Sequence, residues 1–203
     1  MPNQPFWEQT YADTAVSTFT KEPTVDIKEF YPIFPPNASV LDVGCGEGRN
    51  AVFLAKLGHS VDAFDLSAAG IAKACGIARA SGVKVNFFCC ALENYVFEKD
   101  YDIILSHGVL HLPPKEDRDI FIDKMRSSTK VGGYNVIGIF TDRLPATPDN
   151  APFTHSLFKV GELPEKYRDW ELVHHQEGTF SDTHPGGIRH EHAYERIIAR
   201  KIR

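Results

Sequence analysis

The sequence predicts an α/β fold in which helices cover both faces of a mostly parallel sheet. From residue 38 onward, strand-like apolar runs alternate with segments whose apolar residues recur at helical spacing. Glycines at 44–48, 58 and 82 follow several of these runs, where a strand or helix is expected to end, and Gly132-Gly133 precede a further predicted strand. The 203 residues are 42% hydrophobic, which suits one domain with a sizeable core.

The predicted elements follow the chain in order. The first 37 residues hold one or two helices and a proline-rich connection, which we expect to pack on the main domain as a flap. Apolar runs predict strands at 38–43, 60–64, 84–89, 101–106, 134–140, 170–175 and 191–199. Helical spacing predicts helices at 49–57, 67–80, 117–127 and 161–167. Residues 141–152 contain three prolines and no periodicity, so we expect a lid or binding loop there. The Gly- and His-rich residues 177–188 are expected to separate the last two strands. We thus treat 1–203 as one domain with a flap (1–37), a core (38–140) and a C-terminal part of substrate loops and a terminal strand pair (141–203).

Composition narrows the class of function. The net charge of −5 and the pI of about 6.0 disfavour a strongly basic nucleic-acid surface. No apolar run approaches the roughly 20 residues needed to cross a bilayer, and the start lacks the pattern of a secretory signal. Four cysteines (Cys45, Cys75, Cys89, Cys90) fit neither a disulfide scaffold nor paired zinc-binding spacing. We expect a cytoplasmic protein that acts on a small molecule, not on nucleic acid or a membrane; no sequence pattern specifies an oligomeric state.

The most informative segment is a glycine-rich turn after the first predicted strand. Three glycines, Gly44, Gly46 and Gly48, let the backbone turn tightly and approach a ligand closely. Their GxGxG spacing differs from the GxGxxG fingerprint of dinucleotide folds, which usually carry an apolar residue where Asp42 stands. A carboxylate at this point disfavours a pyrophosphate and favours a ligand with an ammonium group. A tight turn that binds no ligand is the structural alternative.

A second carboxylate, Asp65, ends the second predicted strand, 21 residues after Gly44. A carboxylate so placed can accept hydrogen bonds from both hydroxyls of a ribose. The alternative role is that of a helix N-terminal residue. Next to the glycine-rich turn, we favour the ligand-binding role.

Together with Gly132-Gly133 before a later strand, these residues resemble the class I S-adenosylmethionine-dependent methyltransferases over nearly the whole chain. The resemblance implies a Rossmann-like sheet of seven strands with an antiparallel last strand. It also implies S-adenosylmethionine as cofactor and S-adenosylhomocysteine as product, with Asp42 near the ammonium group and Asp65 on the ribose. The cofactor-binding residues that it implies are Tyr11, Asp42, Gly44, Cys45, Gly46, Gly48, Asn50, Asp65, Leu66, Ala91, Leu92, Glu93 and Ser106.

Further residues of the sequence resemble those of the tellurite-resistance methyltransferases, small enzymes that methylate chalcogen oxyanions and related substrates. These residues are Gly48-Arg49-Asn50, Ser106, Gly132-Gly133-Tyr134-Asn135, Phe158-Lys159-x-Gly161-Glu162-Leu163, Trp170-Glu171 and Ile198-Ala199-Arg200-Lys201. Two features depart from the family. Ala91 stands where many members carry an acid for the adenine amino group, which leaves the Leu92 N–H or Glu93 for that contact. Ser181-Asp182 replace a His-Arg pair of the substrate loop, whereas Arg189 is retained.

Methyl transfer is an in-line displacement from an activated donor, so the enzyme mainly supplies alignment and a site without water. A soft anionic nucleophile, such as a tellurium or selenium oxyanion or a thiolate, needs a cation but no strong base. We predict Arg143 and Arg189 as substrate-binding cations, because a guanidinium can hold an oxyanion through two N–H groups. We predict Arg189 and His107 as catalytic residues; with Ser106, His107 ends the fourth strand at the expected ligand crevice. A solvated surface position is the alternative for both arginines.

Several alternatives remain open at the level of sequence. His190 and His192 share a strand face and could hold a metal, although no HExxH or CxxC spacing accompanies them, and we predict no metal site. Tyr11 is expected to close over the cofactor, or else to pack in the core with Phe6 and Trp7. For the whole chain, the alternatives are a methyltransferase for another metabolite, a non-catalytic cofactor-binding module and, remotely, a nicotinamide-dependent oxidoreductase.

Overall fold

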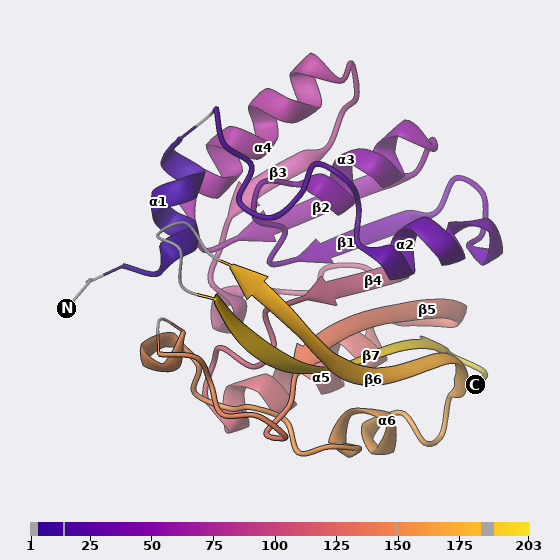
Figure 1. Cartoon of the computed structure of the whole chain (residues 1–203). Helices are drawn as coiled ribbons and strands as arrows, with labels where there is room; N and C mark the ends of the chain where they lie inside the picture. The colour runs from indigo at the N-terminus through magenta and orange to yellow at the C-terminus, as the bar shows by residue number, and fades with distance from the viewer. Residues whose placement is uncertain (1–3, 14, 149, 184–188) are drawn as a thin grey trace.

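The computed structural model describes residues 4–13, 15–148, 150–183 and 189–203. In this part of the chain seven strands form one sheet in the order β3-β2-β1-β4-β5-β7-β6 (Figure 1). The strands are β1 (Ser39–Val43), β2 (Ser60–Asp65), β3 (Asn86–Cys89), β4 (Tyr101–His107), β5 (Thr129–Phe140), β6 (Glu171–Thr183) and β7 (Arg189–Arg200). Strands β1 to β5 pair in parallel, whereas β7 is antiparallel to both of its neighbours. The predicted mostly parallel sheet with an antiparallel last strand is confirmed.

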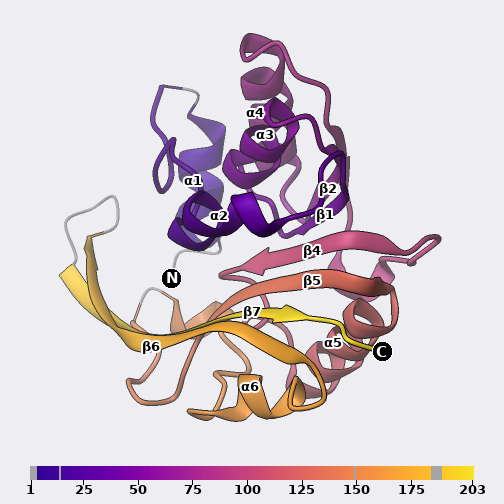
Figure 2. The ribbon, with the colours of Figure 1, turned by 90° about the vertical axis from the view of Figure 1, so that its right-hand side faces the viewer.

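Helices cover both faces of this sheet. They are α1 (Phe6–Ala12), α2 (Val25–Phe30), α3 (Arg49–Lys56), α4 (Ala68–Ala80), α5 (Lys115–Ser127) and α6 (Glu162–Lys166). Short 3₁₀ turns lie at η1 (Tyr31–Ile33), η2 (Leu92–Asn94) and η3 (Ala151–Phe153). The helices α2, α3 and α4 pack on one face and α5 and α6 on the other (Figure 2).

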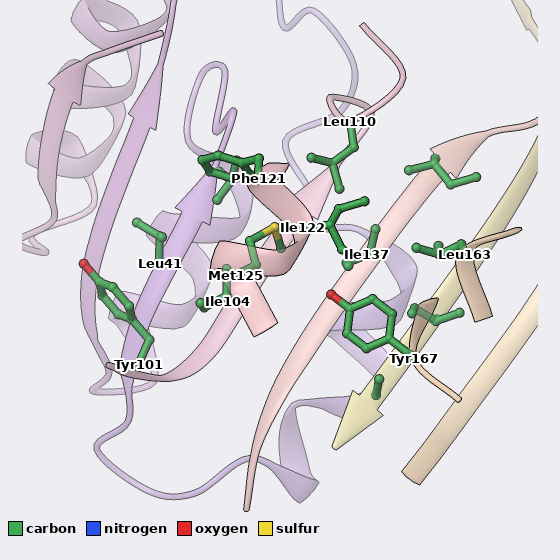
Figure 3. Close-up of a cluster of buried hydrophobic side chains, with 14 of the residues drawn as sticks. Leu41, Tyr101, Ile104, Leu110, Phe121, Ile122, Met125, Ile137, Leu163 and Tyr167 are labelled. Carbon is green, nitrogen blue, oxygen red and sulfur yellow. The ribbon is translucent and has the colours of Figure 1, made fainter. Parts of the chain in front are cut away.

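The two hydrophobic cores follow from the alternation of side chains along buried strands. On β4, for example, Ile103 and Leu105 face the α3 side, whereas Ile104 faces α5. The α5 side holds Phe121 and Met125 against the sheet (Figure 3). Since both faces are buried, the central strands read as continuous apolar runs, which is why the sequence pattern locates them well.

The strand at the sheet edge was predicted wrongly. Residues 177–188 were expected to form a loop, but β6 continues through them as far as Thr183 and pairs with β7 along its whole length. Nearly all side chains from 176 to 183 are exposed or only partly buried, so they carry no apolar alternation that could predict a strand. Residues 184–188 lie outside the described part of the chain. Strand β5 also begins earlier than predicted, at Thr129.

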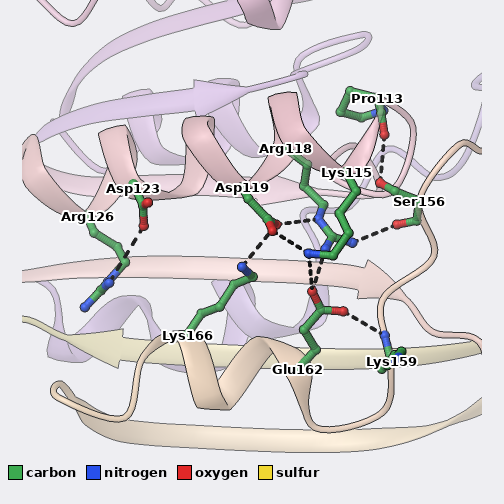
Figure 4. Close-up of polar contacts among 10 residues, drawn as sticks. All are labelled: Pro113, Lys115, Arg118, Asp119, Asp123, Arg126, Ser156, Lys159, Glu162 and Lys166. Atoms are coloured by element: carbon green, nitrogen blue, oxygen red, sulfur yellow. Dashed lines mark hydrogen bonds and ion pairs between the residues drawn. The ribbon is translucent and has the colours of Figure 1, made fainter.

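The segment after β5 is irregular, as predicted, and is attached to helix α5 by a buried arginine. Arg118 is fully buried, with its guanidinium carbon 3.9 Å above the Phe158 ring. It donates a hydrogen bond of 3.0 Å to the Ser156 carbonyl and pairs with Glu162 at the start of α6 (Figure 4). These bonds fix residues 156–162 and leave 141–155 to border the site. None of the helices among the described residues is long and apolar enough to span a membrane.

Candidate functional site

A cleft of about 1200 Å³ opens beyond the carboxyl ends of β1, β2 and β4. In open α/β sheets this edge, at the point where strand order reverses, is where ligands bind. Here the order reverses between β1 and β4. The glycine-rich turn after β1, the end of β2, residues 90–93 and the segment before α2 line one half of the cleft. The ends of β4 to β7 line the other half.

The glycines of the turn are required by both conformation and space. Gly44 and Gly46 have φ of 66° and 54°, in the left-handed region that favours glycine. A Cβ on Gly44 would lie 2.2 Å from a methyl of Val109, and one on Gly46 would lie 2.3 Å from the Tyr11 hydroxyl oxygen. The turn therefore has no space for a side chain at these two positions, because Val109 and Tyr11 pack directly on its backbone.

Asp42 lies at the base of the turn as a buried carboxylate. Its side chain is 2% exposed, and its Oδ2 has no hydrogen-bond partner in the described part of the chain. Burial raises the pKa of Asp42 to about 7, against a smaller lowering by a backbone hydrogen bond from Ala51. An unpartnered carboxylate oxygen at a ligand cleft provides an acceptor for a cationic donor.

Asp65 is held rigidly on the neighbouring strand. Its Oδ2 accepts a hydrogen bond of 2.8 Å from the Gly46 N–H, and its Oδ1 accepts one of 2.8 Å from the Ser67 N–H. Burial raises the pKa of Asp65, while these two backbone hydrogen bonds oppose the rise. The carboxylate thus lines the cleft beside the glycine turn with its orientation fixed.

Residues 5–13 and 15–24, which we call the roof, lie over the glycine turn. A buried ion pair attaches them to the core, because Lys73 Nζ and Glu47 Oε2 are 2.9 Å apart and both side chains are nearly inaccessible. Lys73 donates to the carbonyls of Thr10 and Val16, and Glu47 accepts from the Thr18 N–H. Trp7 packs edge to face on Phe153 of η3, with 5.8 Å between ring centroids. The roof therefore reaches across to the loop after β5.

Most of the predicted cofactor residues lie together at the cleft. Those that line it are Tyr11, Asp42, Gly44, Cys45, Gly46, Asn50, Asp65, Leu66, Ala91, Leu92 and Glu93. Tyr11 is buried against Gly46 and Gly70, and burial raises the pKa of its hydroxyl. Asn50 uses its Oδ1 to accept the Thr24 N–H at 2.8 Å, so it also ties the start of α2 to α3.

Two predicted cofactor residues do not line the cleft. Gly48 is the N-terminal cap of α3 and allows it to approach α4, since a Cβ there would lie 3.0 Å from that of Ala74. Ser106 is fully buried within β4. Gly48 thus helps to position α3, whereas Ser106 belongs to the buried interior of its strand.

The predicted substrate residues separate into two groups. His107 lines the cleft at the end of β4, where burial and the nearby charges of Arg49 and Arg196 lower its pKa to about 3. Arg143 instead lies on the surface, 3.2 Å from Glu177, and Arg189 is exposed with its Nη2 3.4 Å from Ser181 Oγ. Neither arginine is among the described residues that line the cleft.

Arg49 and Arg196 are the arginines among the described residues that line the cleft, and Arg196 was not predicted from the sequence. Its Nη1 lies 3.4 Å from the carboxylate of the buried Asp26 on α2. Asp26 is also 4.0 Å from His107 Nδ1. The alternation His-Ala-Tyr-Glu-Arg over 192–196 was the available signal, because it places three large polar or aromatic side chains on one strand face.

Comparisons with known proteins identify the family of this chain. A family model described as "Tellurite resistance protein TehB" matches residues 5–192. The chain belongs to the TehB family of S-adenosylmethionine-dependent methyltransferases. This membership confirms the resemblance found in the sequence and decides against a nicotinamide-dependent oxidoreductase.

Three comparisons show how similar the chain is to known proteins. TehB of Haemophilus influenzae, described as a probable S-adenosyl-L-methionine-dependent methyltransferase, is 31% identical over 180 residues, which are 87% of this chain and 61% of that protein. The crystal structure of Haemophilus influenzae TehB aligns with a TM-score of 0.77 and 28% identity, covering 96% of this chain and 65% of the other. Hemagglutinin 1 of Eikenella corrodens is 34% identical over 138 residues, 68% of this chain and 45% of that protein. The chain therefore spans about three fifths of the length of the Haemophilus relative.

The residues that line the cleft fit S-adenosylmethionine, the cofactor of this family. The unpartnered Oδ2 of Asp42 is a suitable acceptor for the ammonium of the methionine part, and Gly44 and Gly46 line the same cleft. Asp65, Leu92 and Glu93 line the same cleft. Among the described residues, no group of three His, Cys, Asp or Glu side chains is close enough to hold a metal ion.

Proposed function

We propose that this chain transfers the methyl group of S-adenosylmethionine to a small, soft nucleophile, either a tellurite- or selenite-type oxyanion or a thiol. The observation that carries the proposal is the pair of carboxylates, the buried Asp42 and the half-buried Asp65, on either side of the glycine turn at the cleft. Family membership supports the same reaction.

In this mechanism the cofactor supplies a methyl group that is already activated for displacement, so the protein contributes alignment. Asp42 binds the ammonium group, and Asp65, fixed by two backbone N–H groups, binds the ribose hydroxyls. The roof, with Tyr11 against Gly46, excludes water from the donor. His107 borders the point where donor and acceptor meet, and its low pKa keeps it neutral at physiological pH.

Calorimetry with S-adenosylmethionine and S-adenosylhomocysteine tests the donor half of the proposal. We expect both to bind, and Asp65→Ala to weaken binding by roughly 10- to 100-fold, because it removes charge-assisted hydrogen bonds to the ribose. Asp169→Ala, at an exposed carboxylate beside Arg126, is the control. Absence of binding by the unmodified chain would contradict the proposal.

Product formation separates an enzyme from a non-catalytic cofactor-binding module. We expect S-adenosylhomocysteine to accumulate, together with methylated products, when tellurite, selenite or a thiol is supplied with S-adenosylmethionine. A chain that binds the donor tightly but methylates none of a panel of oxyanions, thiols, phenols and amines would be a binding module.

A further inference from the structure

Strands β4, β5, β7 and β6 form one wall of the cleft, on the side away from Asp42 and Asp65. In the register of the sheet, Gly138 of β5 lies between His107 of β4 and Arg196 of β7, and Phe140 lies opposite Tyr194. Alternate residues of a strand share a face. The side chains of His107, Phe140, Tyr194 and Arg196 therefore belong to one surface, and all four line the cleft.

Aromatic rings are stacked along this surface. Phe140 lies between His111 and His192, with ring centroids 4.5 and 4.3 Å away and interplanar angles of 27° and 16°. Phe180 of β6 continues the series, 5.2 Å from His192 and 5.9 Å from Tyr194. Phe180 is also 39% exposed, although it sits within a cluster of rings. The series therefore ends in an accessible aromatic face at the cleft.

Two glycines keep this surface open. A Cβ on Gly138 would lie 2.7 Å from His107 Nδ1, and one on Gly178 would lie 3.0 Å from the Tyr194 hydroxyl. The rings of His107 and Tyr194 thus lie flat over neighbouring glycine backbone instead of standing up into the cleft.

A guanidinium closes one end of the aromatic surface. The Arg196 guanidinium carbon lies 4.5 Å from the Tyr194 ring centroid, and its Nη2 donates to Gln176 Oε1 at 2.7 Å. The buried Asp26 behind it holds Nη1 at 3.4 Å, and the Nε has no partner among the described residues. Arg196 is therefore a positioned cation, separated from His107 by Gly138 of the intervening strand.

We infer that this surface binds an aromatic thiolate as the methyl acceptor, with its ring on Phe180 and Tyr194 and its sulfur between Arg196 and His107. We call the six lining residues His107, Phe140, Phe180, His192, Tyr194 and Arg196 the acceptor platform. The inference rests on the proposed methyl transfer and selects within its range of soft acceptors. A bare oxyanion would use the cation alone and gain nothing from the stacked rings, whereas an aromatic ring gains from both.

The low pKa values of His107 and of His111, which stacks on Phe140 of the platform, favour sulfur over oxygen as the nucleophile. Burial, followed by nearby positive charges, lowers the pKa of His107 and of His111 to about 3. Such imidazoles are weak bases, so the acceptor has to arrive already ionised. An aromatic thiol does so near neutral pH because its ring stabilises the thiolate, whereas a phenol keeps its proton (pKa ≈ 10 for tyrosine).

The reaction balances without a further reactant. The thiol first loses its proton to solvent. The thiolate sulfur then forms a bond to the methyl carbon, and the bond from that carbon to the donor sulfur breaks. The bonding electron pair goes to the donor sulfur, which becomes the neutral thioether of S-adenosylhomocysteine.

The test compares acceptors at one pH with the full chain. Thiophenol is the aromatic probe, 2,2,2-trifluoroethanethiol is an aliphatic thiol that is also acidic, and sodium tellurite is the oxyanion. We expect kcat/KM for S-adenosylhomocysteine formation to be highest with thiophenol. Equal or higher values with the aliphatic thiol or with tellurite would overturn the inference.

Two substitutions test which platform residues determine the preference for an aromatic thiol. Phe180→Leu should lower kcat/KM for thiophenol by roughly 2- to 12-fold, the range of an aromatic pair, and leave trifluoroethanethiol unchanged; an equal loss for both thiols would overturn the stacking role. Arg196→Met should lower kcat/KM for both thiols by roughly 10- to 100-fold, because it removes the cation that holds the thiolate. Arg200→Met, on the same strand but paired with Glu171 outside the cleft, is the control and should match the unmodified chain.

S-adenosylhomocysteine affinity, measured by calorimetry for every variant, separates the two proposals. If the donor product binds and the acceptors show no preference for the aromatic ring, only the platform inference fails. If the donor product does not bind to the unmodified chain, the proposed function fails as well.

Discussion

Changing Asp42 to Asn should make the free protein more stable and the donor complex weaker. The carboxylate is 2% exposed, and burial raises its pKa from 3.8 to about 7. Because the folded state holds the proton more tightly than the unfolded state, the protonated carboxyl favours the fold at low pH. This contribution is lost as the pH rises from about 4 to about 7. Asparagine keeps the shape of the protonated group and cannot ionise.

The size of both effects follows from the pKa. A displacement from 3.8 to about 7 corresponds to roughly 4 kcal/mol of stability lost by the free protein at pH 7.5, an upper bound for what Asp42→Asn regains. For a chain of this length, each 1 kcal/mol raises Tm by about 2–4 °C. The ammonium of the ligand prefers the carboxylate, so the ligand affinity should fall about tenfold for each pH unit below 7.

The assay is calorimetric titration with S-adenosylhomocysteine from pH 5.5 to 7.5, below the range in which an α-amino group loses its own proton (about 7.7–8.0). We expect the unmodified chain to bind less tightly as the pH falls and to release a proton on binding, seen in buffers of different ionisation enthalpy. Asp42→Asn should bind weakly at all of these pH values and melt at a higher temperature at pH 7.5. An affinity of the unmodified chain that does not change with pH, or a variant that melts below it, would refute the reasoning.

Three further substitutions test how the site is built. Lys73→Met leaves Glu47 buried without its partner and should lower the free energy of unfolding by roughly 3–5 kcal/mol in urea titrations; a loss below 1 kcal/mol would show that the ion pair is not needed. Gly44→Ala forces a methyl to within 2.2 Å of a neighbouring side chain at a φ of 66°, and should weaken S-adenosylhomocysteine binding at least about tenfold with little change in far-UV circular dichroism. Arg118→Met removes the buried guanidinium that pairs with Glu162 and should make residues 141–161 sensitive to limited proteolysis, whereas unchanged cleavage would contradict its anchoring role.

The half of the site that could be predicted from sequence depends on short-range geometry. A strand, a glycine turn and a helix follow one another within 38–57, so Asp42 and Gly46 are placed by local chain direction. Asp65 ends the adjacent parallel strand, and parallel strands bring such ends to the same edge. The same locality explains why both core faces of the sheet were predicted.

Arg196 and Phe180 of the proposed acceptor platform could not be predicted, unlike His107, because they depend on contacts between distant parts of the chain. Arg196 is positioned by Asp26, which lies near the opposite end of the sequence. Phe180 lies on a part of β6 whose exposed side chains resemble a loop, so only pairing with β7 reveals the strand. Arg143 and Arg189 carry the appropriate charge, but the surrounding surface directs them to Glu177 and Ser181.

The contact between Trp7 and Phe153 provides a built-in optical reporter. The sequence has two tryptophans, and the second, Trp170, is packed in the core against Tyr167. In a Trp170→Phe background the emission comes from a single indole at the seam between the roof and the loop after β5. Its wavelength and quenching then follow the opening of that seam in real time, so the entry of the donor can be timed in a stopped-flow instrument without attaching a dye.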